Sequence, residues 1–160
     1  DAALRDFAED HPQLVTYDPA MGMVKLRSDL TFALGSADLR ADAKATLTEL
    51  ADILQGPAAS QYEVRVIGHT DNVPIRKAAT KQKHPTNWHL SVHRAIAVRD
   101  ALETEGVPAV RTSVAGYGMY RPVVTNARKG AEANRRVELY LKPMPTVNRG
   151  MINPQPAEGN

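Results

Sequence analysis

Apolar residues recur at helical spacing in two long stretches of the chain. In the first, they stand three and four positions apart and precede a helix-ending Gly-Pro pair: Leu39, Ala43, Leu47, Leu50 and Leu54, followed by Gly56 and Pro57. In the second, which runs from about Asn87 to Glu105, the predicted core stripe is Trp88, Val92, Ala95 or Ile96, Arg99 and Leu102. Each pattern predicts an amphipathic helix with one buried face.

Alternating patterns predict the strands. Tyr62, Val64 and Val66 alternate with charged residues, as expected of a strand with one buried face. Other short apolar runs bounded by turn residues are 14–17, 23–26, 111–116 and 136–141. From the first strand of the core onward, the order is strand, helix, strand, helix, strand, strand. This order predicts an α+β fold in which two main helices pack on one mixed β-sheet.

The same patterns predict three regions. Residues 1–22 are expected to form a peripheral helix and a strand, and residues 23–142 the main domain. Within that domain, residues 73–85 lie between prolines, carry four basic side chains and predict an exposed inserted loop. Residues 143–160 have four prolines and few apolar residues, which predicts a disordered tail.

Composition limits the possible classes of function. A length of 160 residues suits one domain, and the net charge of +2 comes from mixed signs, so no basic arm for nucleic acid is present. The chain has no cysteine, which excludes thiolate metal sites and cysteine nucleophiles. It has no run long enough to span a membrane and begins at Asp1, so any signal peptide or membrane anchor is expected outside it.

Two opposite charges make the most informative pair. Asp71 follows a predicted strand, while Asn87, Ser91 and Arg94 are spaced to share one face of the second helix. An acid and a guanidinium on neighbouring elements suit a zwitterion, with its ammonium at Asp71 and its carboxylate at Arg94. Alternatively, Asp71 and Arg94 pair with each other, and spacing alone leaves that possibility open.

Four motifs then carry a family resemblance. VRVIGHTDNVPI, NWHLSVHRAIAVRDAL, VAGYGMYRPVVTN and ANRRVELYL occur in an order that resembles the OmpA-like domain family, which includes OmpA, the peptidoglycan-associated lipoprotein and MotB. The resemblance covers about 23–141 and implies a βαβαββ sandwich. It also implies non-covalent binding of peptidoglycan through the meso-diaminopimelate of the stem peptide, without catalysis or cofactor.

Matching the motifs residue by residue assigns the site. The Asp of the TDN triplet is Asp71 and the Arg of the LSxxRA segment is Arg94, which the resemblance implies hold the diaminopimelate end. Further ligand contacts implied by the motifs are Thr70, Asn72, Asn87, Leu90 and Arg135. The link between TDN and the helix is longer than in many members, so the 73–85 loop is either a basic rim for the glycan or a partner, or a solvated insertion.

The expected setting is the periplasm or cell envelope, where the domain anchors an envelope protein, for example of the outer membrane, to the cell wall. A tether to a membrane would lie before Asp1, and a homodimer is possible. One alternative is a MotB-like flagellar stator anchor. Another is a protein-interaction module of the same fold that does not bind the wall.

Other chemistries are less well supported by the residues. His69, His84, His89 and His93 suggest a metal, but Leu90 stands where the zinc-protease motif requires Glu, so we expect no metal. Enzyme activity is not expected, because Ser91 has no histidine at a spacing that would let it act as a base. Trp88, Tyr117 and Tyr120 are expected to pack in the core rather than to stack on sugars.

Overall fold

The computed structural model describes residues 1–144 and 149–152. Its helices are α1 (Ala2–Asp10), α2 (Ser28–Thr31), α3 (Ala41–Gln55), α4 (Ala78–Lys83), α5 (Asn87–Thr104) and α6 (Arg149–Ile152), with short 3-10 turns η1 (Ala109–Arg111) and η2 (Glu132–Asn134). Its strands are β1 (Val15–Asp18), β2 (Met23–Arg27), β3 (Tyr62–His69), β4 (Thr112–Gly116) and β5 (Arg136–Pro143). None of the described helices is both long and apolar enough to cross a membrane.

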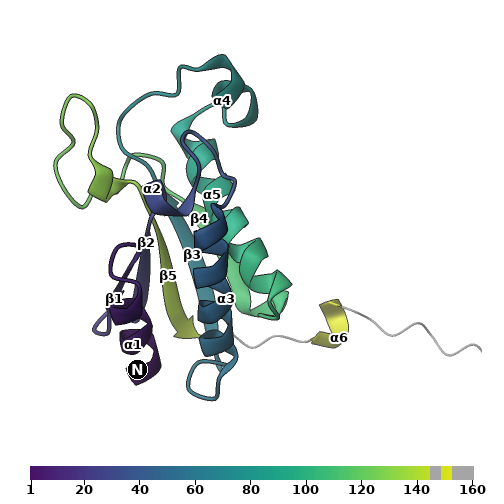
Figure 1. The fold of residues 1–160 in the computed structure, drawn as a ribbon. Helices are drawn as coiled ribbons and strands as arrows, with labels where there is room; N and C mark the ends of the chain where they lie inside the picture. Colours follow the sequence, from purple (N-terminus) through teal and green to yellow (C-terminus); the bar gives the residue numbers. More distant parts are fainter. Residues whose placement is uncertain (145–148, 153–160) are drawn as a thin grey trace, which may run out of the picture.

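The strands form one mixed sheet in the order β1-β2-β5-β3-β4. Only β3 and β4 run parallel, joined by the crossover through α5, and the other neighbours are antiparallel. Helices α1, α3 and α5 pack along this sheet (Figure 1). The predicted α+β class, with two main helices on one mixed sheet, is confirmed.

The core lies between the sheet and these helices. Val64 and Val66 of β3 are fully buried, as their alternation predicts, and the predicted stripe of α3 faces the same core. Leu4 and Phe7 of α1 also belong to this core, so the helix expected to be peripheral is packed into the common interior.

The predicted buried face of α5 is right for Ala95 and Leu102, which are fully buried, and wrong for Trp88. Trp88 is 47% exposed and Ile96 is 36% exposed, whereas the buried residues of the helix are Leu90, Ser91, Arg94, Ala95, Val98 and Leu102. Relative to the predicted face, the helix is rotated so that Ser91 meets the sheet, where only small residues fit between the backbones.

Glycines make that close approach possible. Gly68 and Gly116 are direct neighbours across β3 and β4. A Cβ on Gly68 would lie 1.8 Å from the Ser91 carbonyl oxygen, and one on Gly116 would lie 2.5 Å from the Ser91 Oγ. The start of α5 therefore rests directly on the ends of both strands, which brings it beside the loop that follows β3.

Two segments differ from expectation. Residues 73–85, predicted to be a loop, contain the six-residue helix α4, none of whose residues is buried. In the segment predicted to be disordered, Pro143 ends β5 and residues 149–152 form α6. The remaining residues of that prediction, 145–148 and 153–160, lie outside the described residues. The boundaries at 1–22, 23–142 and 143–160 stay predictions.

Candidate functional site

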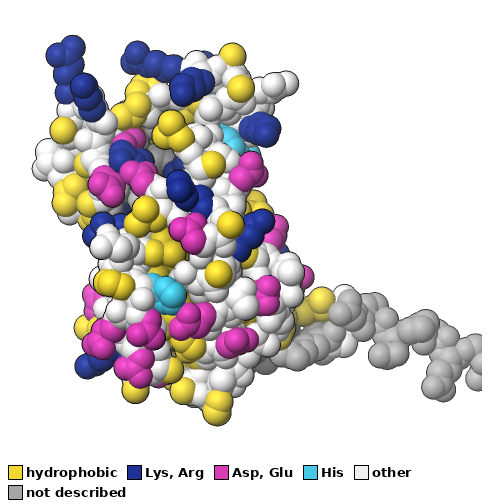
Figure 2. All heavy atoms as spheres, viewed as in Figure 1, with side chains coloured by type: hydrophobic (Ala, Val, Ile, Leu, Met, Phe, Trp, Pro, Cys, Tyr) yellow, Lys and Arg dark blue, Asp and Glu magenta, His cyan; other side chains and the backbone are white. Residues whose placement is uncertain are grey.

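A cavity of about 600 Å³ lies where β3 ends and α5 begins. Its walls come from α2 and the segment after it, the loop after β3, the 73–80 segment, the first turns of α5 and the residues before β5. The lining residues that carry charge are Asp29, Arg40, Asp71, Arg76, Lys77, Arg94, Lys129 and Arg135. Six of these eight side chains are basic, and Figure 2 shows Lys and Arg gathered over this upper end of the molecule.

Asp71 is buried in the wall of this cavity, with 5% of its surface exposed. Its Oδ1 accepts a hydrogen bond from the Val73 backbone N–H at 3.0 Å, an Asx turn that fixes the carboxylate on the loop. Its Oδ2 lies 2.5 Å from Nη1 of Arg135. Gly130 closes over the same oxygen, since a Cβ there would lie 2.2 Å from it. The carboxylate is thus held firmly before any ligand arrives.

Arg135 joins two acids. Besides Asp71, its Nε and Nη2 donate to the two carboxylate oxygens of Asp29 at 2.8 and 2.7 Å. The hydrogen bond to Asp29 is the main cause of a raised pKa of Arg135, opposed by burial and supported by Asp71. Asp29 was missed by the sequence reasoning, because α2 carries no motif that distinguishes this acid from other surface acids. The acidic pole of the cavity therefore has two carboxylates.

Arg94 is nearly buried, at 6% exposure, yet its charge has no acidic partner within the described part of the chain. Its Nε donates to the Ser36 carbonyl at 2.9 Å, and its guanidinium carbon lies 5.0 Å from the Phe32 ring centroid. Among the residues that the structure describes, no carboxylate forms an ion pair with it, and its two terminal nitrogens have no hydrogen-bond partner.

The electrostatics of Arg94 follow from this setting. Burial lowers the pKa of Arg94 to about 10, with the charge of Arg135 acting in the same direction and those of Asp29 and Asp71 opposing it. The side chain stays protonated at neutral pH. It is a desolvated cation with two free donors at the cavity, which is the condition in which a carboxylate is bound most strongly.

Asp71 and Arg94 do not form an ion pair with each other in the structure. Asp71 pairs with Arg135, and the fork of Arg94 is held by a backbone carbonyl and an aromatic ring. Both line the same cavity, so a ligand can reach a carboxylate at one wall and a guanidinium at another.

The other predicted residues divide into three groups. Thr70, Asn87 and Leu90 line the cavity. Asn87 supports the acid's loop, because its Nδ2 donates to the Val73 carbonyl at 3.1 Å. Thr70 Oγ1 donates to the Asp71 carbonyl at 2.9 Å. Asn72 is exposed and is not among the lining residues. Arg135, expected to be secondary, binds Asp71 directly.

The beginning of α5 is fixed by local interactions. Thr86 caps the helix, with its hydroxyl accepting from the His89 N–H. Ser91, fully buried, accepts a hydrogen bond from the Gly118 N–H at 3.0 Å and donates to the Trp88 carbonyl. These contacts set the position of Asn87 and Leu90 at the cavity. Ser28 adds a buried Oγ in the cavity wall that has no hydrogen-bond partner within the described chain.

The histidines that suggested a metal site make separate contacts in different parts of the fold. His84 and His93 share a hydrogen bond between their Nδ1 atoms at 2.7 Å, and burial together with the His93 charge lowers the pKa of His84. His89 lies at the helix cap, and His69 contacts Glu138 on the other face of the sheet. In residues 1–144 and 149–152 no three metal-ligating side chains come together.

The predicted core role of two aromatic residues is wrong. Trp88 and Tyr120 stack on each other at 5.1 Å, yet they are 47% and 60% exposed. Tyr117 is half-buried and stacks on His69. Trp88 is exposed because α5 presents Ser91 and Ala95 to the sheet instead.

Comparison with known proteins shows which family the chain matches. A model described as "OmpA family" matches residues 31–136. The chain is 32% identical to Motility protein B of Bacillus subtilis, over 88% of the chain and 52% of that protein. It is 36% identical to the peptidoglycan-associated lipoprotein of Brucella melitensis, over 74% of the chain and 65% of that protein. The chain thus spans less than two thirds of these relatives.

Solved structures agree. The cell wall anchor of the type VI secretion system (T6SS) from Pseudomonas aeruginosa superposes with a TM-score of 0.74 at 33% identity, covering 88% of this chain and 96% of that chain. The family model covers more than half of the sequence, and the same motifs that line the cavity lie within the matched segment. The chain belongs to the OmpA family.

Proposed function

We propose that this chain is a non-catalytic domain that binds peptidoglycan in the cell envelope and so anchors a larger protein to the wall. Relatives named as a peptidoglycan-associated lipoprotein and a cell wall anchor support this proposal.

The ligand group in the proposal is the diaminopimelate of the stem peptide. Its side-chain end carries one ammonium and one carboxylate. The carboxylate goes to the two free terminal nitrogens of Arg94, and the ammonium goes to the acidic pole formed by Asp71 and Asp29. The unpaired, buried charge of Arg94 is the observation that carries the proposal, because leaving such a charge unpaired is costly unless a ligand compensates it.

The excess of basic side chains in the cavity indicates which charges the ligand should carry. Asp71 and Asp29 already share Arg135, while Arg40, Arg76 and Lys77 line the cavity without a carboxylate partner in the described part of the chain. A stem-peptide segment that carries further carboxylates beside the zwitterionic diaminopimelate end therefore fits this cavity better than that end alone. Thr70, Asn87 and Leu90 line the wall of the cavity, whereas Asn72 is exposed and does not.

The proposal also concerns which kind of parent protein carries the domain. Identity to Motility protein B supports a flagellar stator anchor, in which the same grip resists torque. A homodimer belongs to that version of the proposal. Both a stator anchor and an anchor of another envelope protein require wall binding, so wall binding is tested first.

Co-sedimentation with purified sacculi tests wall binding. The variant Asp71→Asn keeps an oxygen for the Val73 N–H but loses the charge, and Arg94→Gln loses the guanidinium. Each should lower retention about tenfold or more, because one ligand charge is left without its partner on desolvation. Matched controls are Asp52→Asn, an exposed residue of α3, and Arg99→Gln, in α5 outside the cavity; both should bind as the unmutated protein does.

Competition separates the two parts of the proposal. Free diaminopimelate should release the unmutated protein from sacculi. Retention that diaminopimelate does not reduce would refute the assigned ligand while leaving wall binding intact. Equal retention of Asp71→Asn, Arg94→Gln and the unmutated protein would refute the assigned residues.

A further inference from the structure

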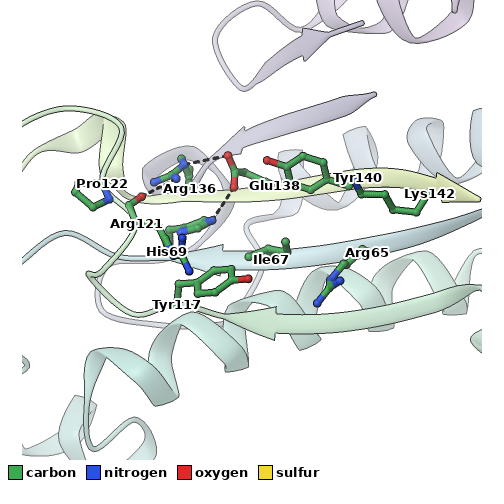
Figure 3. A pocket seen from close by; sticks show the side chains of 10 residues that line it. All are labelled: Arg65, Ile67, His69, Tyr117, Arg121, Pro122, Arg136, Glu138, Tyr140 and Lys142. Atoms are coloured by element: carbon green, nitrogen blue, oxygen red, sulfur yellow. Dashed lines mark hydrogen bonds and ion pairs between the residues drawn. The ribbon is translucent and has the colours of Figure 1, made fainter. Parts of the chain in front are cut away.

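The face of the sheet away from α3 and α5 carries a second cavity, of about 450 Å³ (Figure 3). Val64, Val66 and Gly68 of β3 point to the helices, so Arg65, Ile67 and His69 point to the opposite side. The lining residues are Arg65, Ile67, His69, Tyr117, Arg121, Pro122, Arg136, Glu138, Tyr140 and Lys142. No function proposed above uses this face.

The floor of this cavity is a buried, internally paired network. Glu138 lies between His69 Nε2, at 2.6 Å, and Arg136 Nε, at 3.3 Å, and all three residues are at most 7% exposed. The two terminal nitrogens of Arg136 donate hydrogen bonds to the carbonyls of Asn134 and Arg121. The single acid of the cavity is therefore already engaged, and it offers no charge to a ligand.

The rim is different, because its cations are unpaired. Arg65, Arg121 and Lys142 are exposed, and none of them forms an ion pair with a residue in the described ranges. Arg121 lies over the Tyr117 ring, 4.7 Å from its centroid, and Lys142 lies 5.2 Å from the centroid of Tyr140. Aromatic rings thus hold two of the three cations beside the cavity.

We propose that this cavity is a second binding site, specific for a small anion that carries more than one carboxylate or phosphate group. Its volume falls within the range of small-molecule sites, roughly 300 to 1,000 Å³. Guanidinium and ammonium groups are the usual partners of such oxyanions in proteins, and three of them line this cavity. A neutral sugar fits less well, because the two tyrosine rings already contact cations and Tyr117 also stacks on His69.

The buried network gives this site a rigid base. His69 Nδ1 is buried and has no hydrogen-bond partner among the described residues, so Glu138 and the stacked Tyr117 are what hold the imidazole in place. Glu138 and Arg136 neutralise each other in the floor, so the net charge of the residues that line the cavity is that of the three rim cations. That charge attracts a multivalent anion far more strongly than a monovalent one.

The two cavities are separate although the same strands build them. Arg135 turns to Asp71 in the first cavity and Arg136 turns to Glu138 in the second. At the end of β3, His69 lines the second cavity, and Asp71, two residues later, lines the first. The second site therefore does not depend on the proposed wall ligand, and each can fail without the other.

Titration of the isotope-labelled protein with pyrophosphate and, separately, with citrate at low ionic strength tests the proposal. Saturable chemical-shift changes should appear at His69, Ile67 and Glu138 and not around Arg94. The double variant Arg121→Gln with Lys142→Gln should weaken binding about tenfold or more, since it removes two of the three unpaired charges. The control Arg5→Gln with Lys44→Gln removes the same charge from exposed positions on α1 and α3 and should bind normally.

Three results would overturn the proposal. One is the absence of saturation with either anion, and another is equal binding by the two double variants. The third is a change at these residues that depends on protein concentration alone, which would make this face a contact between copies of the chain. The Arg121 and Lys142 variant should still bind sacculi as the unmutated protein does, which separates this site from the first cavity.

Discussion

Asp71 and Arg94 line one cavity without pairing with each other: Arg135 holds the acid, and the Ser36 carbonyl and the Phe32 ring hold the guanidinium. The separation matters because a pair that neutralises itself has nothing left for a ligand. Here the acid is positioned by its neighbours and the guanidinium keeps two donors free. The site is preorganised, so little ordering is needed when a charged ligand binds.

Replacement of Gly68 by alanine should destabilise the fold strongly. The added Cβ would lie 1.8 Å from the Ser91 carbonyl oxygen, and that backbone atom can move only if α5 moves. We expect a loss of about 3 kcal/mol in the free energy of unfolding, or no folding. Urea denaturation measures it. Gly56→Ala, whose Cβ meets its nearest atom at 3.1 Å, should lose less than about 1 kcal/mol. Similar losses for the two variants would contradict the packing described.

Replacement of Gly130 by alanine should impair the site more than the fold. Gly130 has a φ of +87°, and its Cβ would lie 2.2 Å from Asp71 Oδ2, so the carboxylate must shift. Gly22→Ala is a matched control, with a φ of +60° but 3.6 Å to the nearest atom, a backbone oxygen. Both variants should lose about 1 kcal/mol of stability, because alanine tolerates positive φ poorly.

Calorimetric titration with diaminopimelate then separates the two glycine variants. Only Gly130→Ala should bind it more weakly, because only that substitution displaces Asp71. Equal affinity for both variants would show that the position of the Asp71 carboxylate does not control binding.

Glu138 should make stability depend on pH. Burial works to raise the pKa of Glu138, but the hydrogen bond from His69 and the charge of Arg136 hold it below its usual 4.5 in the folded protein. A carboxylate with a lowered pKa stabilises the fold above its unfolded pKa, and that contribution is lost as pH falls through the folded pKa. Comparison with Glu138→Gln isolates this effect, since the other carboxylates titrate in both proteins.

The measurement is the difference in unfolding free energy between the unmutated protein and Glu138→Gln at about pH 7 and about pH 3. The unmutated protein should be the more stable at the higher pH, and the gap should narrow at the lower pH. A gap that stays constant would mean that the contacts of Glu138 with His69 and Arg136 do not stabilise its ionised form.

Most of the fold could be predicted from the sequence, because periodicity records which faces are buried. The stripe of α3 and the alternation of Val64 and Val66 led to the right elements in the right order. The face of α5 could be read only in part in that way. Hydrophobicity correctly marked Ala95 and Leu102, but the buried side also includes the polar Ser91 and Arg94 and leaves Trp88 exposed.

The candidate site was predictable only in part. Asp71 and Arg94 stand in motifs, and their placement in one cavity agrees with the charge argument, while their role in binding stays a prediction. Asp29 lies 106 residues from its partner Arg135 in sequence, and no local pattern links them. The orientation of successive arginines, Arg135 to one face and Arg136 to the other, depends on the strand pleat at the start of β5.

The central claim is tested most directly by a crystal structure of the protein with diaminopimelate. The account predicts one carboxylate within hydrogen-bond distance of the terminal nitrogens of Arg94 and the adjacent ammonium beside Asp71. Diaminopimelate bound elsewhere, or bound in this cavity with Arg94 turned away from it, would contradict the account.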